Sequence, residues 1–206
     1  SGTASDALSG LARVEVLVRR SSDGLYWGGS AWVGPETWLV ASGTASWQLA
    51  LGSLQFSSGV TVSVSSRAVD AAGNVQSPPA SRSFLYDNGL PASAITTATY
   101  VGPQTWPGAV QGTASDALSG VQLVEVSVLR WLNGQFSYWD GAAWQDGLVQ
   151  SWLPAAGTAT WHLDLAVGQL SHGAQYTAAS RATDAAGNVQ ASAASTVILS
   201  SVWSRT

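Results

Sequence analysis

The sequence predicts an all-β fold made of two tandem Greek-key β-sandwiches. Two observations predict it. The chain of 206 residues spells the phrase "GTASDALSG" twice, at 2–10 and at 112–120. Within each copy, short segments alternate apolar and polar residues, which is the period of a half-buried β-strand. Such segments, in units of about 110 residues, suggest Greek-key β-sandwiches.

The repeat extends over nearly the whole chain. Four more pairs of segments match in the same order: "VEVLVRR" with "VEVSVLR", "YWGGSAW" with "YWDGAAW", "WLVASGTASWQLAL" with "WLPAAGTATWHLDL", and "SRAVDAAGNVQ" with "SRATDAAGNVQ". The spacing between partners changes only at two short insertions, and both lie in loop sequence, where a duplicated domain tolerates change. We therefore expect one domain at 1–87 and a second at 88–206.

The expected strands follow in chain order from the alternation. The clearest alternating apolar sets are Val14, Val16 and Val18; Trp47, Leu49 and Leu51, matched by Trp161, Leu163 and Leu165; and Val60, Val62 and Val64. Residues 82–111 are expected to hold the last strand of the first unit, a linker near "DNGLP" and the first strand of the second unit. Nothing similar precedes residue 1, so the first unit is expected to lack its first strand. Either neighbouring sequence or another chain, by β-augmentation, would supply that strand.

Composition excludes several classes of protein. Hydrophobic residues make up 46 % of the chain and charged residues only 10 %, so a substantial core is expected and general disorder is not. The net charge is −4 and there is no basic run, which argues against nucleic-acid binding. No apolar run approaches the ~20 residues of a membrane span. The absence of Cys excludes disulfides and thiolate metal sites.

Together these phrases resemble the bacterial immunoglobulin-like (Ig-like) repeats of large secreted and cell-surface proteins. The "D-x-A-G-N" that follows "R-A" is the most specific element. The resemblance implies Ig-like sandwiches outside the bacterial cell, in a stalk, adhesin or filament whose partners are neighbouring copies of the same repeat. The segment "LSHGAQY" (170–176) is also similar to a tyrosine corner. The first unit has Val62 in place of Tyr176.

Aspartates in the repeated loops are the candidate metal ligands. In an Ig-like sandwich, the loops that carry Asp116 and Asp184 lie at one pole, where the linker brings Asp87. Three carboxylates suit Ca²⁺, which takes six to eight oxygen ligands, and the ion would stiffen the joint between the units. Asp6 and Asp70 are the equivalents in the first unit. The alternative is local, because Asp and Asn before Gly form Asx turns without any ion.

The eleven Trp residues suggest either packing or sugar stacking. Six that flank Gly-rich turns recur at matching places, which favours packing: Trp27, Trp32, Trp38, Trp139, Trp144 and Trp152. Trp106, Trp131 and Trp203 have no counterpart in the other unit. Because framework residues would be expected to repeat, these three are the candidates for contacts with a partner chain or with surface glycans.

Catalysis is not expected. His162 and His172 stand in no acid–nucleophile spacing, although such triads form in space rather than in sequence. The motifs "G-x-S-x-G", "HExxH", "GxGxxG" and the Walker phosphate-binding loop do not occur. We therefore expect a non-catalytic structural or adhesive segment, polymerising by strand complementation. The alternatives are a carbohydrate-binding module that uses exposed Trp residues, and an accessory domain of a secreted hydrolase.

Overall fold

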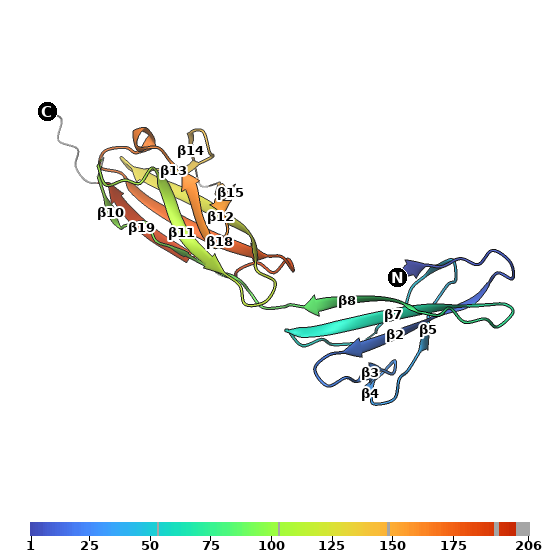
Figure 1. Ribbon diagram of the computed structural model, residues 1–206. Coiled ribbons are helices and arrows are strands. Elements are labelled where there is room, and N and C mark those ends of the chain that lie inside the picture. The colour runs from blue at the N-terminus through green and yellow to red at the C-terminus, as the bar shows by residue number, and fades with distance from the viewer. Residues whose placement is uncertain (53, 103, 148, 192–193, 201–206) are drawn as a thin grey trace. The chain divides into compact units, whose positions relative to one another are not determined.

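A computed structural model describes residues 1–52, 54–102, 104–147, 149–191 and 194–200, the last range by its backbone alone. The chain forms two compact units, Ser1–Asp87 and Asn88–Thr206. Both are built from mainly antiparallel β-sheets (Figure 1), which confirms the all-β prediction. The only helical element in the described ranges is a 3₁₀ turn, Val167–Gln169. No helix in those ranges has the length and apolar character needed to cross a membrane.

Unit 1 has a six-stranded sheet of order β4-β3-β2-β7-β8, in which β5 also pairs with β2, and a two-stranded sheet of β1 and β6. The bounds are β1 (Gly2–Thr3), β2 (Leu11–Arg20), β3 (Tyr26–Trp27), β4 (Trp32–Val33), β5 (Leu39–Val40), β6 (Ser46–Trp47), β7 (Val60–Asp70) and β8 (Ala80–Tyr86). The long pair β2 and β7 is central, with Val14 opposite Ala68 and Val18 opposite Val64.

Unit 2 has a seven-stranded sheet of order β10-β19-β18-β12-β13-β14, in which β15 also pairs with β12, and a four-stranded sheet of order β16-β17-β11-β9. The bounds are β9 (Ala92–Ile95), β10 (Tyr100–Val101), β11 (Ala109–Ser115), β12 (Val121–Leu132), β13 (Gln135–Trp139), β14 (Trp144–Asp146), β15 (Leu153–Pro154), β16 (Ala156–Gly157), β17 (Thr160–Asp164), β18 (Gln175–Asp184) and β19 (Ala194–Ser200). The pair β12 and β18 occupies the place that β2 and β7 take in unit 1.

The repeated Val residues of β2 and β12 form the core, as the alternation predicts. Val14, Val16 and Val18 are each 1 % exposed. The outer face of β2 is covered as well, since Glu15 is only 9 % exposed. This differs from a half-buried strand. Its physical reason is that Arg13 and Arg67 donate to the two oxygens of Glu15, at 2.8 and 2.7 Å. These bonds, the one from Arg13 above all, compensate the buried charge and lower the pKa of Glu15.

The recurring Trp residues pack on arginine in the same way in both units. The Arg67 guanidinium lies 4.0 Å from the centre of the Trp38 ring, and Arg181 lies 4.3 Å from Trp152. Arg181 also bonds Glu125, as Arg67 bonds Glu15. A planar guanidinium can stack on a ring while it donates to a carboxylate, which an ammonium group cannot do equally well. This double use favours packing for these Trp residues and gives a reason for Arg at these positions.

Candidate metal centre

The repeated phrase "SDALSG" is a turn that its aspartate fastens. In unit 1, Oδ2 of Asp6 accepts hydrogen bonds from the backbone N–H groups of Leu8, Ser9 and Gly10, at 3.1, 2.8 and 2.8 Å. The bond from Gly10 above all lowers the pKa of Asp6, because these donors favour the ionised form. Gly10 has a φ of 77°, in the left-handed region that favours glycine.

Asp116 fastens the equivalent turn of unit 2. Its Oδ1 accepts from the N–H groups of Leu118 and Gly120, each at 2.9 Å. Gly120 has a φ of 78°, close to that of its counterpart in unit 1. The local interpretation of the phrase, an Asx-type turn, therefore holds in both units.

The second repeated phrase, "DAAGN", is also held by its aspartate. Asn188 donates to Asp184 from its backbone N and from Nδ2, both at 2.8 Å. Asn74 makes the same two bonds to Asp70, both at 2.7 Å, and its side chain is the main cause of the lowered pKa of Asp70. The two loops thus have the same hydrogen bonds, and the units differ in the residues that lie beside these loops.

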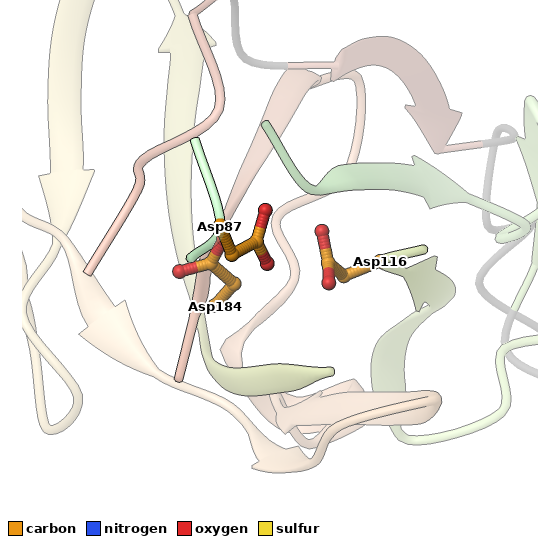
Figure 2. Close-up of side chains that lie close together, drawn as sticks. All are labelled: Asp87, Asp116 and Asp184. Carbon is orange, nitrogen blue, oxygen red and sulfur yellow. The ribbon is translucent and has the colours of Figure 1, made fainter. Parts of the chain in front are cut away.

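Three carboxylates come together beside the loops of unit 2 (Figure 2). Asp87, the residue before the first residue of unit 2, joins Asp116 and Asp184, and one oxygen from each lies within 4.8 Å of the others. Asp184 is 0 % exposed and Asp87 is 8 % exposed. Asp87 also accepts a hydrogen bond from Ser58 Oγ at 3.4 Å. In the described residues this is the only such group of three acids or other metal-ligating side chains.

The geometry of this cluster fits Ca²⁺. Calcium binds oxygens at about 2.3–2.6 Å, so two ligands on opposite sides of one ion lie roughly 4.6–5.2 Å apart. Three oxygens within 4.8 Å of one another can therefore all contact a single ion. Burial of several negative charges is costly unless positive charge or hydrogen bonds compensate it, and a divalent cation supplies that charge. Backbone carbonyls and water would complete the coordination.

Asp6 and Asp70, the other two predicted ligands, are not part of this cluster. They line a hollow of about 240 Å³ in unit 1, together with Ser5, Ala68, Asn74 and Gln76. No third acid joins them among the residues that the structure describes. The linker carboxylate is therefore the difference between the two sites.

Gln190 is a residue of this region that sequence reasoning missed. Its Oε1 accepts from the backbone N and from Oγ of Ser93, at 2.9 and 2.7 Å, and from Ala182 N at 3.1 Å. Ser93 Oγ also lies 2.9 Å from Ser180 Oγ. This network holds β9 against β18. The available signal was the Gln that ends "DAAGNVQ" in both units.

The three Trp residues without a counterpart differ in their exposure to solvent. Trp106 is 8 % exposed and its Nε1 donates to the backbone oxygen of Leu165, so it is a core residue of unit 2 and not the surface contact predicted from the sequence. It lies in the segment between β10 and β11, and within the described residues no such segment packs on unit 1. Trp131 is 38 % exposed. Trp203 lies outside the described residues.

The tyrosine corner predicted in unit 2 is confirmed. Ser171 donates its backbone N–H to Tyr176 Oη at 2.6 Å, and the Tyr176 side chain is 1 % exposed. Burial raises the pKa of Tyr176. The two histidines lie on the surface, and His162 Nε2 is 3.7 Å from Asp164 Oδ1.

No protein-family model matches the chain, and no curated protein sequence matches it. Among solved structures, it is similar to a Ca²⁺-stabilised adhesin with which an Antarctic bacterium binds ice, at a TM-score of 0.28 and 17 % identity over 99 % of this chain and 43 % of that one. It is also similar to a 1.5-MDa bacterial ice-binding adhesin, at a TM-score of 0.27 and 15 % identity over 95 % of this chain and 57 % of that one. The chain thus spans about half of those structures, and likeness at this level carries no inference about its function.

Proposed function

We propose that this chain is a non-catalytic structural or adhesive segment of an extracellular bacterial surface protein. In this proposal its units are Ig-like repeats that associate by strand complementation, and Asp87, Asp116 and Asp184 bind one Ca²⁺. The observation that carries the proposal is the convergence of these three carboxylates within 4.8 Å, two of them buried. The repeated Asp–turn contacts explain the loops themselves, but a turn does not need a third carboxylate from the linker.

The role of the ion is mechanical. Asp116 and Asp184 are each held by hydrogen bonds in their own loop, so they present carboxylates at fixed places. An ion bound to both would also hold Asp87, which follows β8 directly. The chain between β8 and β9 would then lose freedom of motion whenever Ca²⁺ is present. A segment that must transmit force or keep its reach outside the cell would benefit from this restraint.

Thermal unfolding with Ca²⁺ and with a chelator tests the proposal. We expect Ca²⁺ at about 100 times its Kd to stabilise the chain by about 2.7 kcal/mol. Asp116→Asn should abolish that gain, because the amide keeps an oxygen for the turn but loses the charge. Asp6→Asn is the matched control, since it changes the equivalent turn outside the cluster, and it should leave the gain intact. An unchanged melting temperature of the unsubstituted chain would sink the proposal.

A second candidate function, carbohydrate binding, is favoured by one observation. Trp131 and Phe136 are 38 % and 41 % exposed, their ring centres are 4.3 Å apart, and they line a hollow of about 240 Å³ with Gln175 and Thr177. Exposed aromatic rings beside polar side chains can stack on sugars. Glycan-array binding that Trp131→Ala removes would support this function. Binding that survives the substitution would contradict a role for this surface.

A further inference from the structure

The first two strands of unit 2, β9 and β10, cover one side of this unit. There β9 pairs with the outer edge of β11, with Ser93 opposite Ala114 and Ile95 opposite Gly112. Farther along, β10 pairs with the outer edge of β19. The core under this segment is sealed, since Trp161 is 2 % exposed and Leu165 is 1 % exposed.

Unit 1 has an equivalent of the strand pair β11 and β17, on which β9 lies in unit 2. Gly2 pairs with Trp47 and Thr3 with Ser46, as Gly112 pairs with Trp161 and Thr113 with Thr160 in unit 2. Within the described residues, however, no strand pairs with the outer edge of β1 or with that of β8. An edge of this kind offers unpaired backbone N–H and C=O groups, which are a template for an added strand.

The apolar positions beside these edges are less buried in unit 1 than in unit 2. Val64 and Leu51 are only half-buried, whereas their counterparts Ala178 and Leu165 are 0 % and 1 % exposed. Phe84, on the open edge strand β8, pairs with the core residue Val62 and is still 44 % exposed. A hollow of about 570 Å³ adjoins β1 and Trp47. The open side of unit 1, called the groove below, thus has partly exposed apolar side chains beside the unpaired edges of β1 and β8.

The groove also contains a hydrogen-bond acceptor, the side-chain oxygen of Gln76. Gln76 Oε1 accepts one hydrogen bond, from Ala68 N at 3.1 Å. Its counterpart Gln190 makes that same bond to Ala182 and accepts two more from Ser93 of β9. Gln76 Oε1 could therefore accept hydrogen bonds from a Ser that lies in a bound strand where Ser93 lies in β9. The carboxylates of Asp6 and Asp70 lie in the same hollow as Gln76.

We propose that this groove of unit 1 binds an extended polypeptide strand with the chemistry of residues 87–111. In that strand a carboxylate comes first, a Ser six residues later reaches Gln76, and a Trp near its end covers the apolar floor. The bound strand closes the second sheet and adds a third carboxylate to Asp6 and Asp70. This inference rests on the proposed function for its third carboxylate and for strand complementation between repeats.

A synthetic peptide of residues 86–111, added to the full chain, tests the proposal. We expect one peptide to bind per chain and to slow amide hydrogen exchange at residues 2–5 and 84–86. Gln76→Ala should weaken binding at least tenfold, because it removes the acceptor of two hydrogen bonds and a single bond of about 1.4 kcal/mol corresponds to a factor of ten. Gln190→Ala is the matched control and should leave the affinity unchanged, because that site already holds β9. A peptide with Ser93→Pro, which lacks the N–H donor, should bind more weakly than the parent peptide.

The measurement is made in Ca²⁺ and in chelator, so that failure of the groove and failure of the metal site give different results. Binding in chelator that tightens in Ca²⁺, with the tightening lost when the peptide carries Asp87→Asn, is the expected result. No binding in either buffer would overturn the proposal even if the chain alone binds Ca²⁺. Protection that appears only in unit 2, or an affinity that Gln76→Ala does not change, would overturn it as well.

Discussion

Removal of one hydroxyl group, by Tyr176→Phe, should destabilise unit 2 measurably. Tyr176 is 1 % exposed, and its Oη accepts the backbone N–H of Ser171 at 2.6 Å. Since water cannot replace the lost oxygen in a packed site, the N–H loses its partner, at a cost of about 1–3 kcal/mol. For a unit of this size, roughly 4 °C of melting temperature corresponds to 1 kcal/mol, so the transition should fall by about 4–12 °C.

The assay is thermal and urea unfolding of the full chain, with the transition of unit 2 fitted separately. Tyr138→Phe is the control, because Tyr138 lies in the same unit and no hydrogen bond to its hydroxyl occurs among the described residues. It should cost less than about 0.5 kcal/mol. Equal effects of the two substitutions would refute the reasoning.

The pH dependence gives a second check on the same residue. Burial raises the folded-state pKa of Tyr176 above its ordinary value of 10.0. The neutral phenol is therefore favoured in the folded state, and its contribution is complete below about pH 10 and lost as the pH rises through the folded-state pKa. The unsubstituted chain should lose this contribution at high pH, whereas Tyr176→Phe has none to lose.

Two further results are expected from other residues. Gly112→Ala would place a methyl group against the backbone oxygen of Ala94 and the ring of Trp161. The free energy of unfolding, measured in urea, should therefore fall by about 1–3 kcal/mol. Gly168→Ala is the control and should change it very little, because no atom lies within reach of the added methyl group. The pKa of Asp6 is lowered in the folded state, so its contribution to stability is present above about pH 4 and is lost as the pH falls through the lowered pKa. The urea midpoint of unit 1 should therefore fall with pH in that range, and it should fall less in Asp6→Asn. An equal dependence of the midpoint on pH in Asp6→Asn and in the unsubstituted chain would contradict this.

Much of the fold follows from local patterns in the sequence. Period-2 alternation predicts the strands around Val14, Val62 and Trp161, because neighbouring residues of a strand face opposite sides. The tyrosine corner is predictable from "LSHGAQY" for a similar reason, since its contact spans only five residues. The burial of Glu15 was not predictable in this way. It depends on Arg67, which pairs with it across the sheet.

The candidate site shows the same division. The turns of Asp116 and Asp184 are local and could be predicted from Asx chemistry, whereas their approach to Asp87 required an assumed topology. The prediction for Trp106 was wrong because a residue without a repeat partner need not lie on the surface; Trp106 belongs to the core of unit 2. The role of Gln190 depends on Ser93, 97 residues away, and no local pattern reports such a distant contact.

Calorimetric titration of Ca²⁺ into the full chain tests the central claim most directly. The chain should bind one Ca²⁺ with measurable heat, because one cluster holds three carboxylates within 4.8 Å of each other. Asp116→Asn should remove that binding and Asp6→Asn should not. Titration of the unsubstituted chain that gives no binding, or binding that Asp116→Asn leaves intact, would contradict a calcium site at Asp87, Asp116 and Asp184.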